Sequence, residues 1–114
     1  MILAFGGSGP QTLPGLGGFK VALDAIEGLR RQWACELGPP GIRVVTLKTG
    51  GVPESLPDTV SGRDEITASI QQATLLNRTA TLADVGNVAA FVASDQARTM
   101  TATEVNISCG VIVD

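Results

Sequence analysis

Few side chains in this sequence could carry out chemistry, because it contains no histidine and no tyrosine. The two cysteines, Cys35 and Cys109, lie far apart and match no metal-ligand spacing, so we expect no zinc or haem site. Two glycine-rich segments match phosphate-binding loops only in part. Pro10 interrupts the pattern that begins with Gly6-Gly7-Ser8-Gly9, and no Ser or Thr follows the lysine that ends residues 15–20. We therefore interpret these glycines as turn residues.

Composition and charge argue against two classes of partner. The net charge is −3 and there is no basic cluster that could release counterions from phosphates, so we expect no nucleic acid. No apolar run approaches the roughly 18 residues of a membrane span, so we expect no membrane partner. Charged residues make up only 17% of the chain, which favours burial of its surface by a partner. We predict that both cysteines are buried, reduced thiols and that the protein is cytoplasmic.

The hydrophobic pattern predicts a single α/β domain over residues 1–114. Apolar residues at helical spacing from Phe19 to Leu37 indicate a long amphipathic helix, which Gly38-Pro39-Pro40-Gly41 ends. Thr81 and Asp84 predict a capping box at the start of a later helix. The predicted strands are 2–5, 42–47 and 104–107, with 111–113 as a candidate extension of the sheet edge, and the predicted helices are 19–37, 64–76 and 82–94.

This order of elements predicts a parallel sheet of about three strands flanked by helices. Three strands make a poor sheet on their own, because both outer strands present unpaired N–H and C=O groups. The first of them, residues 2–5, is also strongly apolar. We therefore expect these strands to be part of a larger sheet.

A series of segments along the chain carries a more specific signal. Gly18 to Leu23 leads into Gly28-Leu29, Glu36 to Val44 spans the end of the long helix and the next strand, and Thr49-Gly50-Gly51-Val52 follows. The series closes with residues 81–85, 91–95 and 101–105. In order and spacing these segments resemble the C-terminal half of a classical short-chain dehydrogenase/reductase. The resemblance implies a partial Rossmann-like (doubly wound) parallel sheet, to which this chain supplies the last three strands.

The resemblance also implies an NAD(P)-dependent oxidoreductase and assigns candidate site residues. In that family a tyrosine exchanges a proton with the substrate, a lysine four residues later lowers its pKa and binds the nicotinamide ribose, and a serine orients the carbonyl. Lys20 occupies the lysine position, and Ser8 is the nearest candidate for the serine, although another alignment places Gly7 there. The tyrosine position is Leu16. Gly50, Gly51 and Val52 match the family's backbone segment that binds the nicotinamide carboxamide.

Departures from the family pattern leave several functions open. Leu16 has no proton to donate, and Glu54 replaces a family threonine where its charge would repel an anionic dinucleotide. We expect impaired catalysis and no binding of NAD(P) by the isolated chain, since the family's dinucleotide-binding units have no counterpart here. Lys20 is then either a ribose ligand or an inherited, solvated lysine. The alternatives are a non-catalytic, self-associating structural module and a small-molecule binder using the crevice at the strand ends.

The resemblance and the exposed first strand together favour a partner chain. We expect a homo-oligomer, a dimer or tetramer, built on the apolar face of the helix that contains Trp33 or on the strand edge. A complementary N-terminal half that supplies the missing strands is the other partner that the pattern allows.

Overall fold

A computed structural model of the chain describes residues 1–10 and 12–114. Three parallel strands form one sheet in the order β1-β2-β3. The strands are β1 (Ile2–Gly6), β2 (Val44–Lys48) and β3 (Thr103–Asn106), and the helices are α1 (Gly17–Leu37), α2 (Arg63–Ala73) and α3 (Leu82–Ala93). The predicted α/β class, the parallel sheet and all three helices are confirmed.

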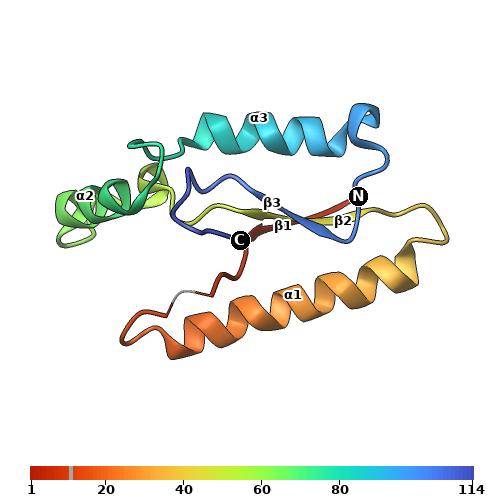
Figure 1. Cartoon of the computed structure of the whole chain (residues 1–114), viewed down its shortest axis with the longest axis horizontal. Coiled ribbons are helices and arrows are strands. Elements are labelled where there is room, and N and C mark those ends of the chain that lie inside the picture. The colour runs from red at the N-terminus through yellow and green to blue at the C-terminus, as the bar shows by residue number, and fades with distance from the viewer. Residues whose placement is uncertain (11) are drawn as a thin grey trace.

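The helices α1 and α3 cover opposite faces of the sheet, and α2 lies beyond the carboxyl ends of the strands (Figure 1). β2 is the central strand, with Leu3 of β1 opposite Val45 and Thr103 of β3 opposite the same residue. β1 and β3 are therefore edge strands, as the sequence predicted. Among the described residues, no helix combines the length and the apolar character that a membrane crossing requires.

The face of the sheet under α3 is apolar. Val45 and Leu47 of β2 are fully buried against Val92 of α3, and the surrounding hydrophobic side chains are Leu3, Val88, Ala89, Met100, Val105 and Ile107. α3 begins with the predicted capping box, in which Asp84 N–H donates to the Thr81 hydroxyl at 3.1 Å and Thr81 N–H donates to the Asp84 carboxylate at 2.9 Å. This layer is the hydrophobic core of the chain.

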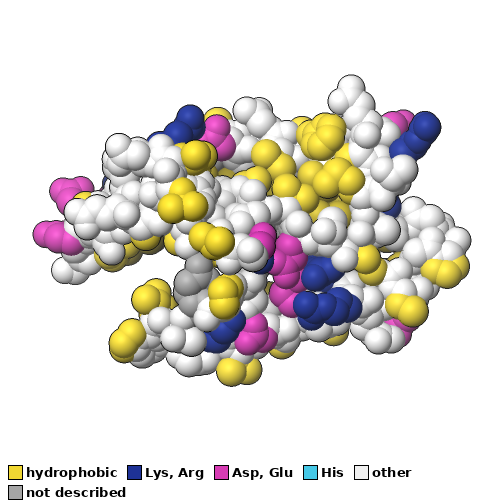
Figure 2. Space-filling model, in the orientation of Figure 1, with side chains coloured by type: hydrophobic (Ala, Val, Ile, Leu, Met, Phe, Trp, Pro, Cys, Tyr) yellow, Lys and Arg dark blue, Asp and Glu magenta, His cyan; other side chains and the backbone are white. Residues whose placement is uncertain are grey.

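The face of the sheet under α1 carries buried charged side chains. The buried residues of α1 are Glu27 and Arg30, whose side chains form an ion pair at 2.7 Å. Arg30 also lies 3.6 Å from Glu104 of β3, and Glu104 pairs with Lys48 of β2. Lys48 in turn pairs with the Asp114 carboxylate at 2.7 Å. We call these five residues the ionic cluster; in Figure 2 acidic and basic side chains meet near the middle of the molecule, below hydrophobic side chains over α3 and β3.

Charge pairing and burial act against each other inside the ionic cluster. Burial and the neighbouring Glu27 carboxyl raise the pKa of Glu104, whereas Lys48 lowers it. Burial lowers the pKa of Lys48, but hydrogen bonds to Asp114 and Glu104 raise it, and the net shift is upward. Glu27 Oε1, Arg30 Nη1 and the Thr46 hydroxyl are buried without a hydrogen-bond partner among the described residues. The cluster therefore holds its charges by mutual pairing rather than by complete hydrogen bonding.

Buried charged residues on one side of α1 leave an apolar stripe, Ile26, Leu29 and Trp33, exposed on another. Ile26 is 38% exposed, Leu29 47% and Trp33 40%. The sequence predicted this amphipathic helix, but its two fully buried residues, Glu27 and Arg30, are charged.

Two sequence predictions are wrong. Cys35 is exposed on α1 and Cys109 is only half-buried, although both thiols are free as expected. Cys35 is exposed because the ionic cluster sets the rotation of α1 about its axis. Residues 111–113 form no strand, because the chain after β3 turns at Ser108 and the Ile112 carbonyl accepts a hydrogen bond from the Asn106 side chain at 2.8 Å.

The ionic cluster predicts a large stability loss from breaking one pair. We expect Arg30→Met to lower the free energy of unfolding by about 3–5 kcal/mol, since Glu27 would remain buried without its partner. The double variant Glu27→Leu/Arg30→Met should recover most of that loss. Urea unfolding measures both changes. The control is Arg63→Met, which breaks an exposed pair of the same length with Asp58 and should change stability by less than about 1 kcal/mol. Equal losses for Arg30→Met and Arg63→Met would contradict the expectation.

Candidate functional site: a cleft at the carboxyl ends of the strands

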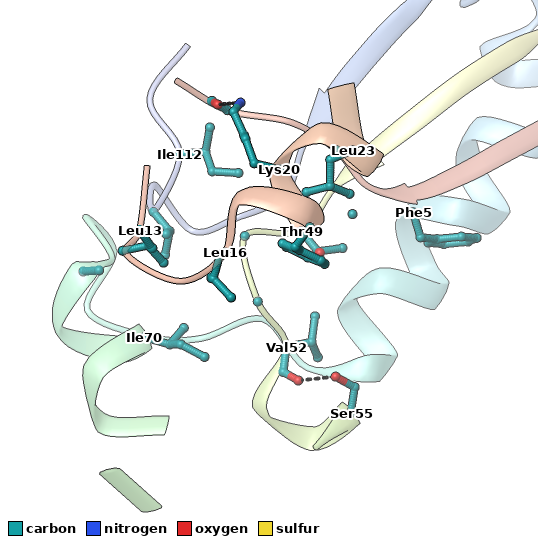
Figure 3. Close-up of a pocket in the computed structure, with 18 of the residues that line it drawn as sticks. Phe5, Leu13, Leu16, Lys20, Leu23, Thr49, Val52, Ser55, Ile70 and Ile112 are labelled. Carbon is teal, nitrogen blue, oxygen red and sulfur yellow. Dashed lines mark hydrogen bonds between the residues drawn. The ribbon is translucent and has the colours of Figure 1, made fainter. Parts of the chain in front are cut away.

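A cleft of about 850 Å³ opens where the strands end. Its walls come from the loop after β1, the first turns of α1, the loop after β2, α2, the start of α3 and the segment after β3 (Figure 3). In an open parallel sheet this edge is where ligands bind, because the loops that leave the strands converge there. The sequence-predicted residues Lys20, Gly50, Gly51 and Val52 all line this cleft, whereas Ser8 is not a lining residue and contacts Lys20.

The Gly50-Gly51-Val52 segment forms the floor of the cleft below β2. Gly50 has a φ of +66°, and a Cβ atom there would lie 2.6 Å from the Cβ of Ser108, so only glycine fits. The carbonyl of Val52 accepts hydrogen bonds from both the amide of Ser55, at 2.9 Å, and its hydroxyl, at 2.7 Å. The backbone at Val52 is therefore engaged within the chain itself.

Lys20 is held by groups of its own chain. Its ammonium donates to the Ser8 hydroxyl at 2.6 Å, to the Gly9 carbonyl, and to the Asp24 carboxylate at 3.2 Å. An ammonium group has three N–H donors, so these contacts use all of them. Figure 3 shows the side chain directed away from Ile70 and Val52, which lie across the cleft.

Asp24 completes this group and was not among the residues singled out from the sequence. It lies four residues after Lys20 on the same face of α1, and the Ser8 hydroxyl also donates to it. Hydrogen bonds from Ser8 and from Lys20 hold the pKa of the Asp24 carboxyl below its usual value. The i, i+4 spacing of Lys20 and Asp24 is the sequence feature from which this ion pair could have been predicted. The contact with Ser8 crosses a loop that no local pattern describes.

Leu16 stands at the cleft wall, at the N-cap of α1, where the family pattern places a tyrosine. Its side chain is 43% exposed and lies with Leu13, Leu23 and Ile70 in an apolar lining. No other residue replaces the phenol, because none of the 114 residues is tyrosine. The cleft wall therefore has an alkyl group where acid–base chemistry would need an O–H.

Glu54 lies at the start of α3 rather than free at the cleft mouth. Its carboxylate accepts a hydrogen bond at 2.9 Å from the backbone N–H of Leu82, the first residue of α3. Unpaired N–H groups give a helix N-terminus its positive character, so Glu54 neutralises part of it. Sequence reasoning identified Glu54 as an unusual charge but missed this contact, because the two residues are 28 positions apart.

Comparisons with known proteins agree with this geometry. Residues 6–112 match the family model described as enoyl-(acyl carrier protein) reductase. The chain is 29% identical over 100 residues to the enoyl-[acyl-carrier-protein] reductase [NADH] FabI of Haemophilus influenzae, covering 88% of this chain and 38% of the relative. It is 32% identical over 110 residues to the short-chain dehydrogenase/reductase SDRA of Arabidopsis thaliana, covering 96% and 42%.

A solved structure gives the same picture in three dimensions. The enoyl-(acyl-carrier-protein) reductase of Anaplasma phagocytophilum in complex with NAD superposes with a TM-score of 0.83 at 29% identity, covering 96% of this chain and 42% of that one. The chain thus spans about two fifths of the length of the relatives that it matches. The names of the two enoyl-[acyl-carrier-protein] reductases connect those proteins with NADH or NAD. With its sequence match, its parallel sheet and its cleft at the strand ends, the chain belongs to the short-chain dehydrogenase/reductase family.

Proposed function

We propose that this chain is a catalytically impaired, NAD(P)-related oxidoreductase module, which performs no hydride transfer by itself. The observation that carries the proposal is Leu16 at the cleft wall, where the family has its proton-exchanging tyrosine. Hydride transfer to or from a carbonyl needs a group that supplies or accepts a proton at the substrate oxygen. Lys20 is a poor substitute, because contacts with Ser8, Gly9 and Asp24 use the three N–H donors of its ammonium.

The residues present do not fit a nicotinamide cofactor. Lys20 would have to give up contacts with Ser8, Gly9 and Asp24 to reach a ribose hydroxyl. The Val52 carbonyl is bonded to Ser55, and Glu54 places a carboxylate at the α3 N-terminus, where phosphate groups would otherwise be favoured. These residues alone therefore do not form a nicotinamide site.

The edge of β1 is the place where a complementary polypeptide segment would join. β1 pairs with β2 on one side, and its other edge is unpaired among the described residues. Phe5 of this strand is 53% exposed. Parallel strands are normally buried on both sides, so an added strand at this edge would cover apolar surface as well as pair N–H and C=O groups. The relatives are more than twice as long as the segment that matches this chain, so they contain further polypeptide of the kind that would supply an added strand.

A self-associating module is the second candidate function, and the outer face of α1 favours it. Ile26, Leu29 and Trp33 form an exposed apolar stripe on one flank of the helix, while charged residues face the sheet. The stripes of two protomers would pack against each other across a two-fold axis, and each would bury the other.

For the cofactor, we expect no saturable binding of NADH by the isolated chain at micromolar concentrations, the range that corresponds to about −8 kcal/mol of binding free energy. Titration followed by nicotinamide fluorescence measures this, with the Escherichia coli relative, an enoyl-[acyl-carrier-protein] reductase [NADH], as the positive control. The same samples should leave the nicotinamide absorbance unchanged when an enoyl thioester is added. A micromolar Kd or turnover above background would contradict the proposal.

For self-association, we expect the chain to sediment as a dimer or larger at micromolar concentration. Leu29→Asp should shift it to the monomer, because it would bury a carboxylate in an apolar contact. The control is Val21→Asp, which places the same charge at a residue of α1 that is 67% exposed and lies outside the stripe. A stable wild-type monomer, or equal dissociation by both variants, would exclude this interface.

For the Lys20 group, we expect the pKa of the Asp24 carboxyl to rise toward its usual value both in Ser8→Ala and in Lys20→Met. Both substitutions remove a hydrogen bond that stabilises the carboxylate. A carboxyl-carbon NMR titration of Asp24 measures the change. If neither variant moved the titration, the ammonium and hydroxyl would be free to serve a ligand, and Lys20 would be available to a cofactor, contrary to the proposal.

A further inference from the structure

We propose that the cleft binds an uncharged, apolar small molecule and discriminates against anions, because the positive groups on its walls are neutralised by carboxylates of the same chain. The inference rests on the proposed function, since it describes the same cleft working without a nicotinamide.

The lining of the cleft is largely hydrocarbon. Its apolar side chains come from β1, the segment before α1, α1, α2 and α3, and include Phe5, Leu13, Leu16, Leu23, Ile70 and Val85. Several of them are exposed in the open cleft, among them Phe5 at 53% and Leu13 at 66%. A volume of about 850 Å³ is in the range of ligand pockets that enclose drug-sized molecules. An apolar ligand would remove this surface from water.

The charged groups at the cleft are already paired. Lys20 is the one charged residue among the lining residues that the structure describes, and its ammonium is bound to Asp24, Ser8 and Gly9. An anionic ligand would have to displace the Asp24 carboxylate, which is anchored twice, by Lys20 and by the Ser8 hydroxyl.

The second positive feature is the N-terminus of α3, whose first residue, Leu82, lines the cleft. A free helix N-terminus attracts anions through its N–H groups and its dipole. Here Glu54 takes the Leu82 N–H, and Asp84 pairs with Thr81 and with Arg78, the latter at 3.2 Å.

The charged groups at Lys20 and at the α3 N-terminus include more carboxylates than cations. The cations are Lys20 and Arg78, and the carboxylates are Asp24, Glu54 and Asp84, so these groups sum to −1. The cleft therefore presents hydrocarbon for burial and no uncompensated positive charge. A carboxylate, sulfonate or phosphate entering it would lose hydration without gaining a counter-charge.

Two fluorescent probes that differ by one charge test the inference. N-phenyl-1-naphthylamine is neutral, and 1-anilinonaphthalene-8-sulfonate is the same ring system with a sulfonate. We expect the neutral probe to bind at least about tenfold more tightly. Glu54→Gln should narrow that ratio by about two- to fivefold, by restoring positive character at the α3 N-terminus. The matched control is Glu36→Gln, the same charge change near the other end of α1, which should leave the ratio unchanged. Equal affinities, or a ratio insensitive to Glu54→Gln, would overturn the inference.

A second pair of variants locates the probe. Leu16→Asp places a carboxylate in the lining and should weaken the neutral probe about tenfold or more. Aspartate is also a good N-cap, which Leu16 is not, so the variant should fold. Val21→Asp adds the same charge on α1 outside the lining and should have no effect. An equal loss in both variants would place the probe on the outer face of α1 and overturn the inference.

The proposed function is tested separately in the same preparations. Hydride transfer with a preserved preference for the neutral probe would refute the proposed function alone. An inactive chain that binds both probes equally would refute the inference about the cleft alone.

Discussion

The constraint on which this structure depends is the pairing of charges between α1 and the sheet. Glu27 and Arg30 are buried where a helix in an α/β fold normally presents aliphatic side chains, and Glu104 and Lys48 meet them from the strands. A buried charge without its partner is strongly unfavourable, so α1 has little freedom to rotate about its axis. That rotation decides which residues of α1 face outward, including the apolar stripe and the Cys35 thiol.

The family and the chemistry of the site diverge in this chain. The sheet, the glycines after β2 and the long helix are those of a short-chain dehydrogenase/reductase, and the sequence match runs through nearly the whole chain. The two positive features at the cleft, however, are satisfied internally: Lys20 by Asp24 and Ser8, and the start of α3 by Glu54. A fold persists as long as its packing does, whereas a catalytic site needs polar groups left free for a substrate.

The sequence predicts this fold well because its elements have strong local signals. The β-branched residues of β2, the proline and glycine stop after Leu37 and the Thr81–Asp84 capping box are all visible within a few residues. The failures are contacts between distant residues. The side of α1 that meets the sheet depends on Glu104, more than 70 residues away, and the role of Glu54 depends on Leu82. Residues 111–113 resemble a strand in composition, yet the Asn106 side chain holds the segment in a turn.

Because β2 is buried on both faces, its hydrophobicity alone does not determine which of its side chains face α1 and which face α3, and its charged residues make that choice. All five of its residues are buried, and a strand buried on both sides has no apolar-polar alternation to say which side chain faces which layer. Here Val45 and Leu47 enter the hydrophobic core, whereas Thr46 and Lys48 enter the ionic layer. A slip of one residue would put the ammonium of Lys48 against Val92 and leave Arg30 facing hydrocarbon. The charged residues on one face of β2 thus fix its pairing register. A redesign that made both layers apolar would remove the energetic difference between the native register and a slipped one.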